Sequence, residues 1–155
     1  MKLSMFRICT ILAIGFAASQ TILSAQESSL IGVWNVSVTV TNCQTGAVIR
    51  TVHSLQLFSR DGSLTETANT ASRGSSEGIW TNAGGQTYND TFWFYRFNPD
   101  GTFKSLAKGM DTIALGQDGE FTSTGTVQDF DANGNLISIG CVTHSAVRLS
   151  DGNGN

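Results

Sequence analysis

Six ionisable residues of this chain could provide acid–base chemistry or bind a polar ligand group, and they are His53, Glu66, Asp90, Arg96, Asp111 and His144. An ionisable side chain that faces an apolar interior has a shifted pKa and can act as a general acid or base. His144 is the candidate for an inward position, because it has the same parity as Arg148 on one predicted strand. A single inward histidine is more often a hydrogen-bonded structural residue than a catalyst. Glu66, Asp90 and Arg96 are interpreted as surface charges.

The sequence lacks the motifs that identify common catalytic or cofactor sites. It contains no G-x-S-x-G, H-E-x-x-H, phosphate-binding loop or dinucleotide fingerprint. The two cysteines and two histidines of residues 26–155 lack the short spacings that are typical of zinc sites. The sequence therefore predicts neither a metal nor a cofactor, and it assigns no catalytic residues.

The first 25 residues have the pattern of a secretory signal peptide. Lys2 and Arg7 precede an apolar run at 8–18. Small residues then precede a predicted cleavage site after Ala25. The apolar run is shorter than the roughly 20 residues that a membrane-spanning helix needs. We therefore expect a secreted or periplasmic protein with no membrane insertion after cleavage, in which residues 26–31 form a short N-terminal extension.

Cleavage would leave 130 residues with seven basic and twelve acidic side chains, a net charge of −5. No basic stripe remains, so neither nucleic acid nor an anionic membrane surface is an expected partner. The remaining cysteines, Cys43 and Cys141, would lie in an oxidising compartment, where an even pair predicts a disulfide. The length fits one domain, and the sequence does not specify an oligomeric state.

Seven turn signals divide the rest of the chain into eight strand-like runs, and they lie at 42–46, 60–62, 69–76, 82–85, 98–101, 116–119 and 131–135. Asp-Gly and Asn-Gly pairs favour hairpins, because Gly and Asn accept the positive φ of tight turns. Short connections make successive strands antiparallel neighbours. We therefore predict an all-β fold, an eight-stranded antiparallel up-and-down β-barrel at 32–149 without significant helix, followed by a tail at 150–155. Two stacked sheets are the alternative.

Closure of the barrel can be tested on the first and last strands. The numbers of opposed residues in an antiparallel ladder sum to a constant. The sum for Trp34 with Arg148 differs by only two from the sum for Cys43 with Cys141. Both pairs therefore fit nearly one register, with the cysteines on the face opposite Trp34. In this register Val36, Val38 and Val40 form an inward wall.

Gly32-x-Trp34 on the first strand, together with Arg148 near the end of the last, resembles the signature of the lipocalin-like, calycin-type barrels. The resemblance implies that Trp34 closes the barrel floor and that Arg148 packs across it, a cation–π contact. The chain departs from a typical lipocalin, because it has no late T-D-Y-type motif and no following helix. In outline it is similar to short bacterial lipocalin-like proteins, to avidins and to allene oxide cyclase barrels.

The end of the barrel away from Trp34 is the predicted mouth, beneath the connection at 69–76. Candidate wall residues are Trp80, Phe92, Trp93, Phe94, Tyr95, Phe97 and Phe103. Among these, Trp80, Phe92, Phe94 and Tyr95, with His144, form the predicted ligand site for a small apolar molecule. The alternative is that half of the aromatic residues fill a core and half cover the outside. Two other functions stay open: an isomerase or cyclase resembling allene oxide cyclase, and a filled barrel that acts through surface protein contacts.

Overall fold

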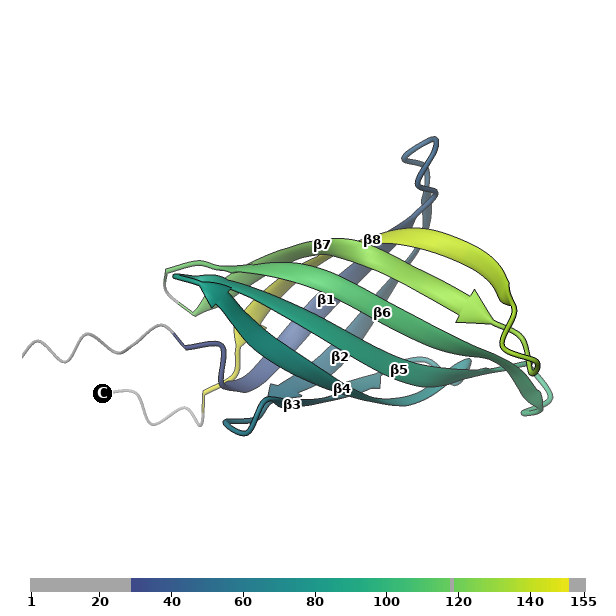
Figure 1. Cartoon of the computed structure of the whole chain (residues 1–155), viewed down its shortest axis with the longest axis horizontal. Helices are drawn as coiled ribbons and strands as arrows, with labels where there is room; N and C mark the ends of the chain where they lie inside the picture. The colour runs from purple at the N-terminus through teal and green to yellow at the C-terminus, as the bar shows by residue number, and fades with distance from the viewer. Residues whose placement is uncertain (1–28, 118, 151–155) are drawn as a thin grey trace, which may run out of the picture.

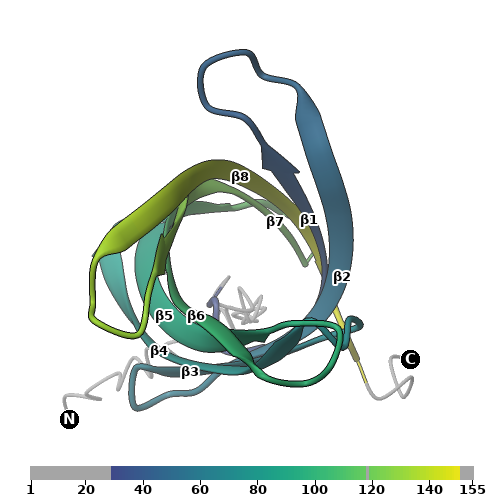
Figure 2. The same ribbon diagram turned by 90° about the vertical axis from the view of Figure 1, so that its right-hand side faces the viewer.

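The computed structural model describes residues 29–117 and 119–150, and it forms one closed β-barrel (Figures 1 and 2). Its strands are β1 (Gly32–Thr41), β2 (Val48–Phe58), β3 (Ser63–Ala68), β4 (Arg73–Gly84), β5 (Thr87–Phe97), β6 (Phe103–Leu115), β7 (Glu120–Phe130) and β8 (Leu136–Arg148). The predicted signal peptide, half of the predicted N-terminal extension (26–28) and most of the predicted C-terminal tail (151–155) lie outside the described residues.

The strands follow one another around the barrel in the order of the sequence. Each strand pairs antiparallel with the next, and β8 returns to pair antiparallel with β1. The predicted eight-stranded up-and-down barrel is therefore confirmed, and the two-sheet alternative is excluded. The described residues form no helix, so none of them belongs to a helix long and apolar enough to cross a membrane.

The closing seam between β1 and β8 has the register that the sequence predicts. Trp34 lies opposite Arg148, and Thr41 lies opposite Cys141 at the other end of the ladder. Just beyond this ladder, Cys43 forms the predicted disulfide with Cys141, with a Cα–Cα distance of 5.0 Å. The bridge links residues 98 positions apart and holds the seam near the end of the barrel opposite Trp34.

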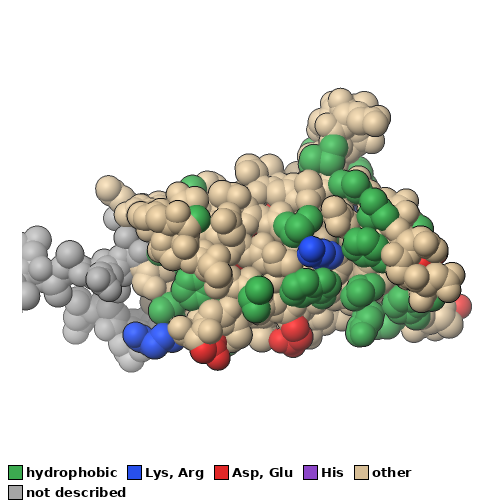
Figure 3. Space-filling model, viewed as in Figure 1, with side chains coloured by type: hydrophobic (Ala, Val, Ile, Leu, Met, Phe, Trp, Pro, Cys, Tyr) green, Lys and Arg blue, Asp and Glu red, His purple; other side chains and the backbone are tan. Residues whose placement is uncertain are grey.

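Side chains alternate between the inside and the outside of the barrel, as period-two strands require. On β1 the buried residues include Val36, Val38 and Val40, which confirms the predicted inward wall. On β5 the even-numbered residues from 88 to 96 are buried, whereas Trp93 and Tyr95 are exposed. Figure 3 shows apolar side chains gathered on the outer surface toward the right-hand end.

Gly32, Trp34 and Arg148 meet at the floor of the barrel, and their contacts there account for their positions in the sequence. The Arg148 guanidinium lies 4.2 Å from the centre of the Trp34 ring and donates hydrogen bonds to the carbonyls of Ser29 and Ile31. The Trp34 indole N–H donates to the carbonyl of Leu30 at 2.8 Å. Gly32 has a φ of 139°, and a Cβ there would lie 2.5 Å from Nη1 of Arg148. Glycine is therefore required at position 32, because the backbone has a positive φ there and because a Cβ would collide with the Arg148 side chain.

Candidate functional site

The barrel interior has three levels, and the lowest is an aromatic floor. Trp34 packs edge-on against Phe121 with ring centres 4.8 Å apart, and Phe58 contacts both Phe121 and Trp80. Trp80 also packs against Tyr88 and donates its indole N–H to the carbonyl of Ser59 at 3.0 Å. These contacts fill the closed end with side chains.

The middle level is polar, although it is enclosed by the barrel wall. Its buried residues are Ser54, Gln56, Glu66, Ser76, Asp90, Asp111, Ser123 and His144. The interpretation of Glu66, Asp90 and Arg96 as surface charges is wrong, because only 2%, 5% and 7% of these residues is exposed. They occupy inward positions on β3 and β5, where neighbouring polar groups and aromatic rings replace part of their contact with water.

Asp90 and Asp111 form an acidic pair in this middle level. They lie directly opposite each other on β5 and β6, and Gly125 lies opposite Asp111 on β7. A Cβ at Gly125 would lie 2.0 Å from Oδ1 of Asp111, so the glycine makes room for the carboxyl group. Within the described chain, Oδ1 of Asp90 and both carboxyl oxygens of Asp111 have no hydrogen-bond partner.

Burial is the main cause of an altered protonation state at the acidic pair. Burial and the adjacent Asp111 raise the pKa of Asp90 to about 8. Burial and the charge of Glu66 raise the pKa of Asp111 to about 7. Both carboxyl groups therefore carry protons for a large part of the time at neutral pH. The residues that the structure describes contain no cluster of three or more His, Cys, Asp or Glu side chains that could hold a metal.

His144 faces inward on β8, as its parity predicts, and it is 6% exposed. Its Nδ1 shares a hydrogen bond with Oγ of Ser123 and lies 3.5 Å from Oδ2 of Asp111. Burial lowers the pKa of His144 to about 4, so the ring is neutral at pH 7. In a catalytic triad, serine and aspartate contact different ring nitrogens. Here Ser123 and Asp111 both approach Nδ1, so these three residues do not form a serine-hydrolase site.

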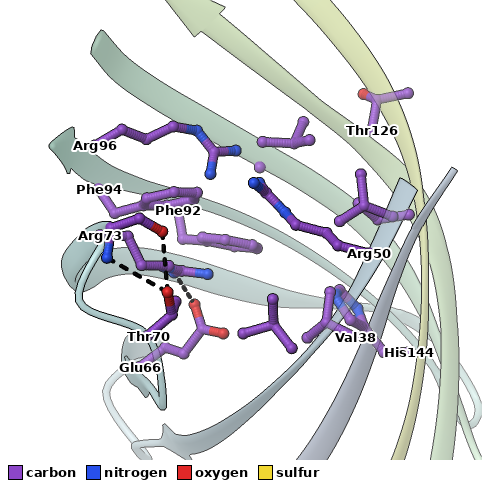
Figure 4. Close-up of a pocket in the computed structure, with 16 residues that line it drawn as sticks. Val38, Arg50, Glu66, Thr70, Arg73, Phe92, Phe94, Arg96, Thr126 and His144 are labelled. Atoms are coloured by element: carbon purple, nitrogen blue, oxygen red, sulfur yellow. Dashed lines mark hydrogen bonds and ion pairs between the residues drawn. The ribbon is translucent and has the colours of Figure 1, made fainter. Parts of the chain in front are cut away.

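The upper level is a cavity of about 60 Å³ at the mouth of the barrel (Figure 4). Its apolar wall comes from Val38, Val40, Val52, Phe92, Phe94, Val127 and Val142. His144 forms part of its inner boundary, and Thr70 and Ser72 contribute from the connection between β3 and β4. The predicted overhanging connection does reach the cavity, although it is shorter than expected because β4 begins at Arg73.

Two arginines at this mouth are held by carboxylates and by one aromatic ring. Arg73 pairs with Glu66 at 2.5 Å and also donates to Ser76, and its guanidinium lies 3.6 Å from the centre of the Phe94 ring. Arg96 pairs through Nε with Asp129 at 2.5 Å and lies 4.8 Å from the same ring centre. The ion pair with Arg73 and the hydrogen bond from Ser76 contribute to the lowered pKa of Glu66, against the opposing effect of burial.

A third arginine, Arg50, enters the cavity from β2. Its side chain is exposed, and its guanidinium makes no hydrogen bond or ion pair within residues 29–117 and 119–150. Neither Arg50 nor Arg73 was predicted from the sequence as a site residue. A signal for Arg50 was present, because residues directly opposite on neighbouring strands point to the same face, and Arg50 lies opposite the inward Val40.

The structure brings together only part of the predicted ligand site. Phe92, Phe94 and His144 line the mouth cavity. Trp80 instead belongs to the floor, and Tyr95 is 57% exposed on the outer face of β5. The aromatic residues of β5 are thus divided between the interior and the outside, as in the alternative interpretation of the sequence.

Comparison of the chain with protein-family models and with curated proteins finds no match. The likeness to calycin-type barrels is therefore one of architecture alone. A closed barrel of eight antiparallel strands, with Trp34 and Arg148 at its floor, is consistent with a calycin-like fold.

Proposed function

We propose that this protein binds a small, mainly apolar molecule at the mouth of its barrel. The observation that carries the proposal is the wall of the cavity, in which valine side chains and the rings of Phe92 and Phe94 face one another. These two rings stack with centres 6.2 Å apart and an angle of 19° between their planes. Apolar cavities of this kind, with a few polar groups at one side, are the usual sites for small ligands.

The volume of the cavity limits how much of a ligand it can enclose. A water molecule needs roughly 10 to 15 Å³ of such space, so about 60 Å³ accommodates only a few water-sized groups. The aromatic floor and the polar middle level occupy the rest of the interior. We therefore propose that one end of the ligand enters the cavity and that its remainder lies in the mouth, between the loops.

Support for a binding role also comes from the way the two ends of the barrel differ. The floor is closed by Trp34, Phe121 and Arg148, whereas the mouth leaves a space that side chains do not fill. Together with the predicted signal peptide, this arrangement fits a protein that sequesters or carries a small molecule outside the cytoplasm.

A fluorescent probe tests this proposal. N-phenyl-1-naphthylamine is uncharged and fluoresces more strongly in an apolar site, so saturable enhancement is expected with the mature protein. Val142→Phe places a ring into the cavity and should weaken probe binding at least tenfold. Val147→Phe changes an exposed position of the same strand and should leave binding within about twofold, because Val147 is 46% exposed and lies outside the cavity. Equal binding by both variants would contradict the proposal.

An isomerase or cyclase is a second candidate function, and the observation that favours it is the position of His144. Its Nδ1 shares a hydrogen bond with Ser123, and the residue borders the cavity. A neutral histidine held in this way can remove a proton from a bound substrate and return it to another carbon. Such a reaction in deuterium oxide would introduce deuterium into an unsaturated ketone or acid, and His144→Gln would abolish the exchange. Exchange that is unchanged in His144→Gln would exclude this role.

A further inference from the structure

We propose that the ligand carries an anionic oxygen group, such as a carboxylate, which binds to Arg50 and Arg96 while its apolar part contacts Phe94 and the valine wall. This inference rests on the proposed binding function and specifies the chemical class of the ligand. The ligand would therefore be amphipathic, with its charged end at the rim of the mouth.

Two of the arginine side chains point into the same space. Figure 4 shows Arg50 and Arg96 extending toward each other from opposite sides of the cavity, with Phe94 beside Arg96. Arg50 comes from β2 and Arg96 from β5, so strands on different parts of the barrel wall bring the two guanidinium groups to one space. An oxygen anion between them could accept hydrogen bonds from both.

Arg50 and Arg96 both keep hydrogen-bond donors that the described residues do not use. A guanidinium group has five N–H donors and no acceptor. Arg96 uses Nε for Asp129, and the structure gives its two terminal nitrogens no hydrogen bond with the described residues. The Arg50 guanidinium uses none of its donors in this way. Arg73 uses both donors of its Nη2 atom for Glu66 and Ser76, and its Nε is buried without a hydrogen-bond partner among the described residues.

Positive side chains outnumber negative ones around the cavity. Three arginines border the cavity, whereas its neighbouring carboxylates are Glu66 and Asp129, one for Arg73 and one for Arg96. The whole chain has only nine Lys and Arg residues and a net charge of −3, so three of its few cations meet at this mouth. One positive charge is left without a counter-charge, and a ligand with one negative charge would balance it.

The electrostatics of Arg50 agree with this charge count. Partial burial lowers the pKa of Arg50, and the neighbouring charges of Arg96 and Arg73 lower it further against the opposing effect of Asp129. The guanidinium groups therefore repel one another in the ligand-free protein. An anion bound among them would remove part of this repulsion, and charge-assisted hydrogen bonds to arginine are among the stronger ones in proteins.

Paired competitors that differ only in the charged group test the inference. Octanoate and 1-octanol have the same number of carbon atoms, and each can displace N-phenyl-1-naphthylamine from the mature protein. We expect Arg50→Gln to weaken displacement by octanoate about tenfold and to change displacement by 1-octanol less than about twofold. Arg60→Gln is the matched control, because Arg60 is an exposed arginine in the turn between β2 and β3 at the opposite end of the barrel.

The outcomes separate this inference from the function on which it rests. Failure of the naphthylamine probe to bind any form of the protein would contradict the binding function itself. Probe binding together with equal loss of octanoate and 1-octanol in Arg50→Gln would contradict the anion site alone. An equal effect of Arg60→Gln on octanoate would indicate general attraction to positive charge and would also contradict it. Loss of the octanoate effect above 0.5 M salt is expected, since screening weakens a partly exposed ion pair.

Discussion

The floor and the mouth of this barrel both place arginine on an aromatic ring, but they use the pair differently. At the floor, Arg148 lies 4.2 Å from the Trp34 ring centre and its terminal nitrogens donate to two backbone carbonyls. At the mouth, Arg96 lies 4.8 Å from the Phe94 ring centre with both terminal nitrogens unused, and Arg50 has no partner among the described residues.

This difference shows how one type of contact can serve either stability or binding. A guanidinium whose donors are taken by the backbone fixes the structure around it, and here it closes the first and last strands. A guanidinium that keeps free donors beside a cavity can accept a ligand. The number of unused guanidinium N–H donors therefore distinguishes the two roles, whereas residue type and ring contact do not.

The largest effect is expected at the floor, from Trp34→Ala. Removing a fully buried indole should lower the free energy of unfolding by about 3 to 5 kcal/mol, because a cavity remains and the ring contacts are lost. Trp93→Ala on the outer face, where Trp93 is 38% exposed, should cost about 1 kcal/mol or less. Urea unfolding measures both variants. Equal losses in the free energy of unfolding would contradict the assignment of Trp34 as the structural floor.

The disulfide should provide the next largest contribution, at the end of the barrel opposite Trp34. The Cys43→Ser, Cys141→Ser double variant should lose about 2 to 4 kcal/mol, since the bridge restricts a loop of 98 residues in the unfolded chain. Denaturant unfolding with and without reductant measures this loss. Reductant should destabilise the wild-type protein and leave the double variant unchanged, and free thiols in the unreduced wild type would contradict the bridge.

Replacement by glutamine should affect stability much more at Arg148 than at Arg50. Arg148→Gln should cost about 2 kcal/mol, because two charged hydrogen bonds and the contact with Trp34 are lost. Arg50→Gln should change the free energy of unfolding by less than about 0.5 kcal/mol, because the guanidinium makes no bond within the described chain. Thermal unfolding compares them. A larger loss of stability from Arg50→Gln than from Arg148→Gln would contradict the claim that Arg148 stabilises the fold and Arg50 does not.

The polar level between floor and mouth should make stability depend on pH. Asp90 and Asp111 have pKa values raised to about 8 and about 7, so the folded protein holds protons that the unfolded chain has released. Their contribution is complete below pH 3.8 and is lost as pH rises through 7 and 8. His144 has a lowered pKa and acts in the opposite direction, but only between about pH 4 and 6.5.

The useful window is therefore from pH 6.5 to 8, where the histidine no longer contributes. The free energy of unfolding should fall there by about 2 kcal/mol in the wild type. Asp90→Asn and Asp111→Asn should each make this fall smaller, because each removes one titrating group. Urea unfolding across the pH window gives the result, and stability that rises in it would contradict the protonated state of the pair.

Much of the fold could be predicted because the controlling signals are local. Asp-Gly and Asn-Gly turns mark the hairpins, and alternation places Val36, Val38 and Val40 on one face. The spacing of Gly32, Trp34 and Arg148 then fixes the closing register. Each of these features depends on a short stretch of sequence or on one pair of strands.

The site was harder to predict because its composition contradicts a common expectation. Charged residues on a strand usually face water, yet Glu66, Asp90 and Arg96 face the inside of this barrel. Their neutralising partners come from other strands, such as Arg73 for Glu66 and Asp129 for Arg96. A pattern read along one strand does not contain those partners.

A crystal structure of the mature protein with octanoate tests most directly the claim that the mouth arginines are reserved for a ligand. We expect a carboxylate within about 2.7 to 3.2 Å of nitrogen atoms of Arg50 or Arg96, with the alkyl chain against Phe94. The floor around Arg148 should be unchanged. Octanoate bound at the outer surface, or in the cavity with its carboxylate away from both arginines, would contradict it.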